Sequence, residues 1–126
     1  MSNRQTAHPM QTDALAELVV SALEDLKGID VRQIDVRGKT SITDVLVIAT
    51  GTSERHLRSL ADRVVERVKE EGVRPLGVEG ERGSDWVLVD LGDVVMHVMS
   101  REKRDFYNLE KLWSIEPRDR AVDGSA

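Results

Sequence analysis

Two short runs of residues, 86–91 and 94–99, constrain the fold of this chain most strongly. Only Gly92-Asp93 separates them, and a two-residue loop that begins with glycine is typical of a type II′ hairpin turn. With this turn, one face of the hairpin is wholly apolar and must point into a core: Val87, Val89, Leu91, Val94, Met96 and Val98. The other face mixes apolar and polar side chains: Trp86, Leu88, Asp90, Val95, His97 and Met99. This mixture is typical of the centre of a protein–protein interface, and cover by a helix of the same chain is the alternative.

The remaining periodicity predicts one α/β (α+β) domain with a mixed five-stranded sheet and flanking helices. Apolar residues at helical spacing predict helices over 13–27, from just after Ser53 to about 71, and over 101–113, the last with Phe106, Leu109, Leu112 and Trp113 as its apolar face. Residues 45–49 are apolar throughout, as in a strand covered on both faces. Shorter strands are expected at 31–36 and 75–79, so residues 45–79 predict a β-α-β unit with parallel strands.

Composition excludes several classes of function. The chain has no cysteine and three scattered histidines, which argues against disulfides, thiol chemistry and a metal site. No apolar run approaches the roughly 20 residues of a membrane span, and no signal peptide is recognisable, so a cytoplasmic protein is expected. A net charge of −5 and 3% aromatic residues argue against a protein that binds free DNA or RNA. The ends lack apolar periodicity, which predicts a flexible arm at 1–11, a domain at 12–114 and a flexible tail at 115–126.

Two features leave an enzyme open as an alternative. Gly51, Thr52 and Ser53 lie where a strand ends and a helix begins, so their backbone amides either bind an anion or form an ordinary N-cap turn. Asp90 and Asp93 are close enough in sequence to suggest a magnesium site, and Asp90 and His97 an acid–base pair across the hairpin. Together these features would suit a nucleotide-binding or nucleotidyl-transferring enzyme, but the simpler structural interpretations need no metal and no cofactor.

Several segments together resemble the ribosomal silencing factor family, also called RsfS or Iojap. The matching segments are Leu26-Lys27-Gly28, Ser41-Ile42-Thr43-Asp44, Thr50-Gly51-Thr52-Ser53 with Arg55-His56, Leu76-Gly77-Val78-Glu79-Gly80, Trp86 to Val95 with His97-Val98, and Tyr107 with Leu109-Glu110-Lys111-Leu112-Trp113. The resemblance implies a nucleotidyltransferase-like fold, although the chain lacks the carboxylate triplet that a nucleotidyltransferase needs. The resemblance implies a protein that is not an enzyme, and the missing triplet agrees with this. It also implies binding to the large ribosomal subunit through its protein number fourteen, which would block joining of the small subunit and repress translation when nutrients are short.

The resemblance also implies where the partner binds. It places the contacts around the hairpin and matches Trp86 and Leu91 to the binding surface, whereas the strand pairing puts Leu91 on the core face. The complete set of expected partner-binding residues is Trp86, Leu88, Asp90, Leu91, Asp93, Val95 and His97. An acidic rim of Glu79, Glu81, Asp90 and Asp93 would orient a basic partner. A homodimer that hides this face when the protein is off the ribosome is a third hypothesis.

Overall fold

The computed structural model describes residues 10–80, 83–109 and 111. Its elements follow in the order α2 (Thr12–Asp25), β1 (Ile29–Asp35), β2 (Val45–Thr50), α3 (Glu54–Glu70), β3 (Gly77–Glu79), β4 (Trp86–Asp90), β5 (Val94–Met99) and α4 (Arg101–Tyr107). The five strands form one sheet in the order β1-β2-β5-β4-β3. The pair β2–β5 is parallel and the other three pairs are antiparallel, so the expected mixed five-stranded sheet is confirmed.

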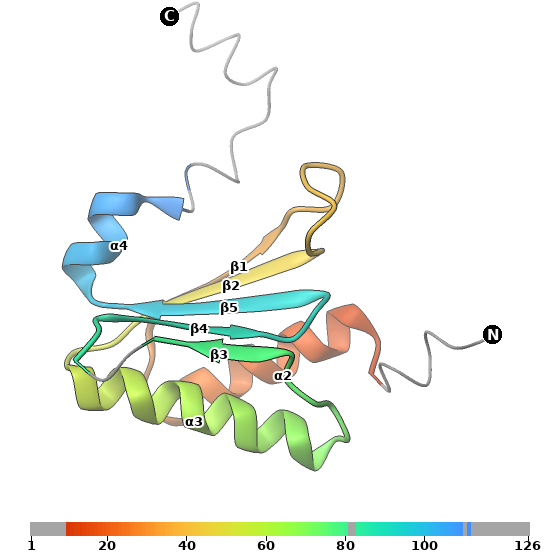
Figure 1. Ribbon diagram of the computed structural model, residues 1–126, viewed down its shortest axis with the longest axis horizontal. Helices are drawn as coiled ribbons and strands as arrows, with labels where there is room; N and C mark the ends of the chain where they lie inside the picture. The colour runs from red at the N-terminus through yellow and green to blue at the C-terminus, as the bar shows by residue number, and fades with distance from the viewer. Residues whose placement is uncertain (1–9, 81–82, 110, 112–126) are drawn as a thin grey trace, which may run out of the picture.

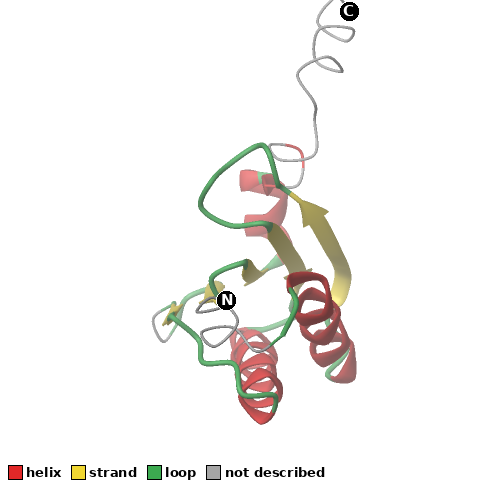
Figure 2. Ribbon diagram, turned by 90° about the vertical axis from the view of Figure 1, so that its right-hand side faces the viewer, coloured by secondary structure: helices red, strands yellow, loops and turns green. Residues whose placement is uncertain are grey.

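Helices α2 and α3 lie together on one face of the sheet, and α4 lies on the opposite side (Figures 1 and 2). The core lies between the sheet and the first two helices, where Val47, Val89 and Met96 are fully buried against Leu60 and Val64 of α3. All six residues of β2 are buried, as expected of a strand covered on both faces. Strands β2 and β3 run in the same direction, as the β-α-β prediction requires, but β5 and β4 separate them.

The hairpin has the register that the sequence predicts. Val87 pairs with Val98, and Val89 pairs with Met96. Gly92 has a φ of +92°, a backbone conformation that favours glycine. The Leu91 amide donates to the Val94 carbonyl over 2.9 Å and closes the hairpin next to the turn. The alternation of residues 86–99 was therefore sufficient to predict which side chains share a face.

The last helix differs from the prediction. It ends at Tyr107, because Asn108 adopts the left-handed conformation with a φ of +51°. Beyond this break Leu109 and Lys111 are again helical, so the predicted helix is interrupted at Asn108. Phe106, expected on the buried face of this helix, is 76% exposed. Leu112 and Trp113 lie outside the described residues, as do almost the whole predicted arm and tail. Among the described residues, no helix is both long and apolar enough to cross a membrane.

Candidate partner-binding face

The strand register assigns the mixed side of the hairpin to the sheet face that α2 and α3 leave uncovered. Residues directly opposite one another on neighbouring strands share a face, so each row across the sheet is read from the pairing. One row is Ile34, Leu46, Val95, Asp90 and Gly77, and the next is Arg32, Ile48, His97, Leu88 and Glu79. A third row contains Thr50, Met99 and Trp86. We call this surface the open face; it contains five of the seven predicted partner-binding residues, Trp86, Leu88, Asp90, Val95 and His97.

Helix α4 covers only one end of the open face. There the Arg104 guanidinium is buried and donates to the Thr50 hydroxyl over 2.9 Å, and Ile48 and Met99 are fully buried. Towards the hairpin turn, Val36, Leu46 and Val95 form a small second cluster, with Ile34 and Leu88 partly buried against it. A helix of the same chain therefore covers one end of this face, as the alternative interpretation expected, whereas Leu88 and Asp90 stay partly exposed beyond it, and there the interface interpretation stays a prediction.

Trp86 lies half-buried at the edge of the covered end, with its indole ring fixed from two sides. The indole Nε1 donates to Nδ1 of His97 over 3.0 Å, and the Tyr107 ring centre lies 4.8 Å from that of the indole. Because Nδ1 accepts this hydrogen bond, His97 is neutral and carries its proton on Nε2. Burial lowers the pKa of His97 from 6.5 to about 4, so the ring stays neutral near pH 7.

The predicted acidic pair does not form a metal site. The Asp90 carboxylate accepts from the Gly92 amide over 2.9 Å, whereas the Asp93 carboxylate accepts from the Thr12 hydroxyl on α2 over 3.1 Å. Within residues 10–80, 83–109 and 111, no group of three or more possible ligands is placed to hold a metal ion. Asp90 and His97 have other partners among the described contacts: the Asp90 carboxylate accepts from the Gly92 amide, and Nδ1 of His97 accepts from the Trp86 indole.

Leu91 requires a correction. It is 3% exposed and belongs to the core cluster beneath α2 and α3. The strand pairing was right for this residue, and the assignment to the partner surface was wrong, because a side chain next to the turn still follows the alternation of its strand. Asp93 also lies apart from the open face, since its carboxylate is bound to α2. Glu81 of the predicted acidic rim is outside the described residues.

In the Gly51-Thr52-Ser53 turn, the amides of Gly51 and Thr52 both donate within the protein. The Gly51 amide donates to the Met99 carbonyl over 3.1 Å, and the Thr52 amide donates to Nδ1 of His56 over 2.9 Å. The Ser53 hydroxyl caps α3 by accepting from the His56 amide. On its other side, the His56 ring contacts the Leu26 carbonyl at the end of α2 through Nε2, at 2.8 Å. These contacts favour the capping interpretation over anion binding, and they give His56 a structural role that its sequence position did not indicate.

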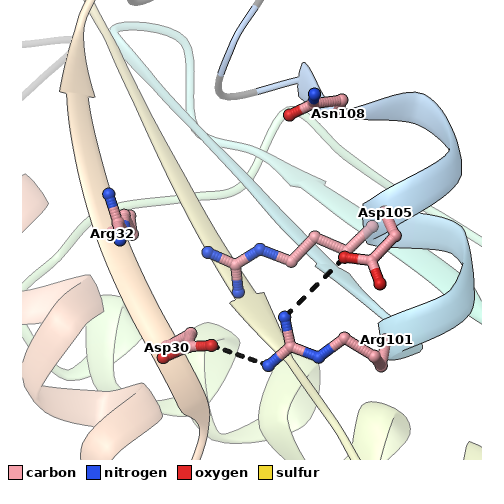
Figure 3. A pocket seen from close by; sticks show the side chains of 6 residues that line it. Asp30, Arg32, Arg101, Asp105 and Asn108 are labelled. Carbon is pink, nitrogen blue, oxygen red and sulfur yellow. Dashed lines mark hydrogen bonds and ion pairs between the residues drawn. The ribbon is translucent and has the colours of Figure 1, made fainter.

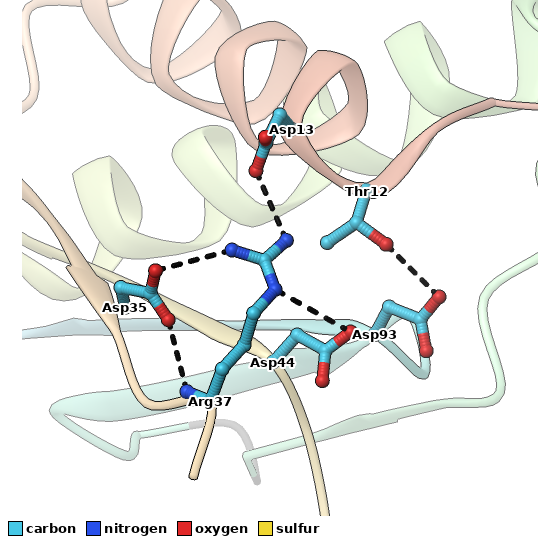
Figure 4. Close-up of polar contacts among 6 residues, drawn as sticks. All are labelled: Thr12, Asp13, Asp35, Arg37, Asp44 and Asp93. Atoms are coloured by element: carbon cyan, nitrogen blue, oxygen red, sulfur yellow. Dashed lines mark hydrogen bonds and ion pairs between the residues drawn. The ribbon is translucent and has the colours of Figure 1, made fainter.

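A second arginine that the sequence did not single out connects the hairpin end of the molecule to α2. The Arg37 guanidinium contacts Asp13 at 3.0 Å, Asp35 at 3.1 Å and Asp44 at 3.9 Å, and Asp93 lies beside this cluster (Figure 4). The hydrogen bond to Asp13 raises the pKa of Arg37. The Arg37 amide, which donates to the Asp35 carboxylate, lowers the pKa of Asp35. The end of the molecule near the turn is therefore acidic, with Arg37 as a counter-charge at its centre.

The class of protein defined by this arrangement is a single α+β domain with a five-stranded mixed sheet, of which α2 and α3 cover one face and α4 covers one end of the other. Comparison with known protein families gives a match over residues 9–125 to the family described as "Ribosomal silencing factor during starvation". The Haemophilus influenzae ribosomal silencing factor RsfS is 46% identical over 101 residues, which cover 80% of this chain and 99% of that protein. The chain therefore belongs to the ribosomal silencing factor family, whose members silence ribosomes and regulate translation.

Solved structures and more distant relatives agree with this assignment. A crystal structure of a Chromobacterium violaceum protein superposes with a TM-score of 0.81 at 43% identity, covering 82% of this chain and 87% of that one. A mouse protein named "Mitochondrial assembly of ribosomal large subunit protein 1" is 36% identical over 106 residues, which cover 82% of this chain and 46% of the mouse protein. The family resemblance expected from the sequence is thus confirmed.

Proposed function

We propose that the open face docks on the large ribosomal subunit through its protein number fourteen and thereby blocks joining of the small subunit. The mechanism is steric exclusion, and no bond is made or broken. Family membership supports a factor that acts on ribosomes, and the name of the mouse relative supports the large subunit as the partner. The observation that carries the proposal is the open face itself, where the partly exposed Leu88 and the ordered indole of Trp86 lie beside a small buried apolar cluster.

The indole of Trp86 is well suited to be an interface anchor. Residues that contribute most to binding are enriched in tryptophan and lie near the centre of an interface. The bond to His97 and the contact with Tyr107 hold the ring before a partner arrives, so little side-chain entropy is lost when it binds. Leu88 lies beside it in the next row and offers a further partly exposed apolar surface.

Charge at one edge of the open face supports a basic partner. Asp90 and Glu79 occupy the β4–β3 side of the two rows that contain the apolar cluster. Such carboxylates orient an approaching basic surface and speed its association, while the apolar residues supply most of the affinity. An enzyme is the less favoured alternative, because the Gly51 turn and the two aspartates of the hairpin are hydrogen-bonded within the protein.

Co-sedimentation with separated ribosomal subunits tests the proposal directly. We expect the protein to pellet with the large subunit alone, and fewer joined ribosomes to form when the small subunit is added. Trp86→Ala should weaken binding by about 2 kcal/mol or more, as expected for an interface anchor. Val65→Ala is the matched control, because it truncates a partly buried side chain on α3, on the other side of the sheet.

Three results would contradict the proposal or parts of it. Pelleting with neither subunit would refute it. Wild-type binding by Trp86→Ala, with an unchanged thermal denaturation profile, would place the interface elsewhere. A marked rise in thermal stability with nucleotide and magnesium would instead favour the enzyme. Light scattering of the free wild-type protein and of Trp86→Ala tests whether a homodimer hides the open face.

A further inference from the structure

The open face is too small to be a complete docking surface. Of the thirteen residues assigned above to its three rows, eight are not buried. A standard interface between two proteins contains about 20–30 residues on each side. If the open face docks on another protein, as proposed above, the contact must therefore continue beyond the strands, either over α4 or towards the hairpin turn.

The loop of residues 36–44 rises at the turn end of the sheet, on the same side as α4 (Figures 1 and 2). It connects β1 to β2, and its first residue, Val36, is buried with Leu46 and Val95 in the small apolar cluster of the open face. Near its tip, Ile42 is 83% exposed. An apolar side chain therefore lies in water directly beside the proposed docking surface.

Contacts within loop 36–44 restrain the backbone on both sides of Ile42. At the base of the loop, the Val36 amide donates to the Asp44 carbonyl over 2.9 Å. Near the tip, the Ile42 amide donates to the Thr40 hydroxyl over 3.1 Å, and the neighbouring Thr43 is buried. The loop is thus ordered before a partner arrives, which lowers the entropy lost on binding.

Exposed carboxylates lie at the base of this loop. The Arg37 guanidinium contacts the carboxylates of Asp35, Asp44 and, on α2, Asp13 (Figure 4). The side chains of these three aspartates are 64%, 43% and 74% exposed, so a basic side chain of a partner can approach them from solvent. An apolar tip with acidic residues at its base has the same composition as the open face, and it suits the same basic partner.

The opposite end of the open face suits a basic partner less well. There Arg101 contacts Asp30 on β1 at 2.6 Å and Asp105 within α4 at 3.9 Å, so these charged side chains pair with one another (Figure 3). The ammonium group of Lys103 lies 5.8 Å from the centre of the Tyr107 ring. A basic surface that extended over α4 would approach this like charge, which is unfavourable.

We propose that Ile42 is a second anchor of the docking surface and is buried against the same basic ribosomal protein that the open face binds. This inference rests on the proposed function. The row of Trp86 and the row of Asp90 are four residues apart on β4, which corresponds to about 13 Å. Loop 36–44 lies beyond the row of Asp90, so the two anchors would hold the partner at opposite ends of the contact (Figure 1).

Binding of the full-length protein to isolated large ribosomal subunits, and to purified large-subunit protein number fourteen, tests this inference. We expect Ile42→Ala to weaken both by about tenfold or more, because each methylene group buried against a partner contributes a factor of roughly four. Its thermal denaturation profile should stay unchanged, since the side chain is already in water. Val78→Ala is the matched control, because it truncates a branched side chain that is 48% exposed and pairs with the core residue Val89. The control should bind both probes like wild type.

A double variant shows whether the two anchors act separately. Because the anchors lie more than about 10 Å apart, the losses of affinity in Ile42→Ala and Trp86→Ala should multiply when the two substitutions are combined. A double variant that binds as well as Trp86→Ala alone would overturn the inference, since Ile42 would then have no contact of its own.

Other results would also overturn it. Wild-type affinity of Ile42→Ala for both probes would do so and would leave the proposed function intact. Weaker binding to the subunit but not to the purified protein would mean that Ile42 contacts another component. A changed oligomeric state of free Ile42→Ala, measured by light scattering, would assign the loop to a contact between copies of this chain. Failure of the wild-type protein to bind would refute the proposed function and this inference with it, so the two failures are distinguishable.

Discussion

The two faces of the sheet are built on different principles. The face beneath α2 and α3 is apolar and dry, with Val47, Val89 and Met96 fully buried. The open face changes within one row from the buried Val95 to the partly exposed carboxylate of Asp90. Of the helices in the described part of the chain, only α4, with seven residues, lies over it. Hydrophobic burial is sufficient to explain the first face, but it does not explain the second.

The open face contains specific polar contacts between side chains, of a kind that a purely apolar core lacks. Arg104 is bound to Thr50, and the Trp86 indole is bound to His97. Buried polar groups of this kind contribute little net stability but fix one arrangement of side chains. The comparison indicates that burial beneath α2 and α3 provides most of the stability of the domain, whereas the open face has the features expected of the proposed docking surface.

The largest expected effect tests this division directly. Leu60→Ala should lower the free energy of unfolding by about 2–5 kcal/mol, because it leaves a cavity beneath α3. Leu88→Ala, the same substitution on the open face, should cost about 1 kcal/mol, because that side chain is only partly buried. Urea denaturation of both variants measures the difference. Equal losses would show that the open face is as much a core as the other one.

The second prediction concerns pH and His97. Burial lowers the pKa of His97 from 6.5 to about 4 in the folded protein, so between these values the unfolded chain takes up a proton that the folded one does not. The contribution of His97 is therefore complete above pH 6.5 and is lost as the pH falls towards 4, by up to about 3 kcal/mol. Protonation of Nδ1 would also remove the acceptor of the Trp86 indole. The charged residues in the same row across the sheet as His97 are Arg32 at one end and Glu79 at the other.

His97→Gln provides the control for this prediction. A glutamine amide oxygen can accept from the indole and does not titrate. Denaturation curves of wild type and His97→Gln, measured at several pH values from 7 to 4, give the free energy of unfolding of each protein. We expect this free energy to fall more steeply with decreasing pH in wild type than in His97→Gln. Parallel losses of stability in the two proteins would mean that other groups cause the acid sensitivity and that His97 titrates normally.

Sequence patterns predicted the helix-covered face far better than the open one. The alternation in 86–99 gave the hairpin register, and the continuous apolar run of 45–49 gave a strand buried on both sides. Both are local patterns that follow from a period of two residues and from hydrophobic burial. The same reasoning placed Leu91 in the core, against the assignment from the family resemblance.

What the patterns missed are polar contacts between distant segments. Arg104 and Thr50 are 54 positions apart, and His56 and Leu26 are 30 apart. In sequence, an arginine within a charged helix is indistinguishable from a solvated one, and nothing local indicates its acceptor. The end of α4 was also missed. It depends on the left-handed conformation of Asn108, and the residues around Asn108 in the sequence do not indicate that conformation.

The third prediction separates capping from anion binding at the Gly51-Thr52-Ser53 turn. Ser53→Ala removes the acceptor of the His56 amide and should lower the free energy of unfolding by about 1 kcal/mol. Inorganic phosphate should stabilise wild type and Ser53→Ala to the same extent, since this turn is not where we expect an anion. A loss of phosphate stabilisation in Ser53→Ala alone would restore the anion interpretation of the turn. Thermal denaturation with and without phosphate measures both quantities.

The smallest effect belongs to the charge at the edge of the open face. Asp90→Asn keeps an oxygen for the Gly92 amide and removes one negative charge. We expect association with the large subunit to slow by roughly two- to fivefold at low salt, with little change in dissociation, because a rim charge acts mainly on the encounter. The difference should shrink above about 0.5 M salt, where charges are screened over a few ångströms.

Asp62→Asn makes the same charge change on an exposed position of α3, across the sheet, and should leave the rates unchanged if position rather than net charge matters. Surface-bound large subunits and association rates at two salt concentrations are sufficient for the measurement. Equal slowing by both variants would indicate that net charge alone steers the protein. That result would remove the electrostatic part of the distinction between the open face and the helix-covered face, and would leave apolar burial around Trp86 and Leu88 as the basis of recognition.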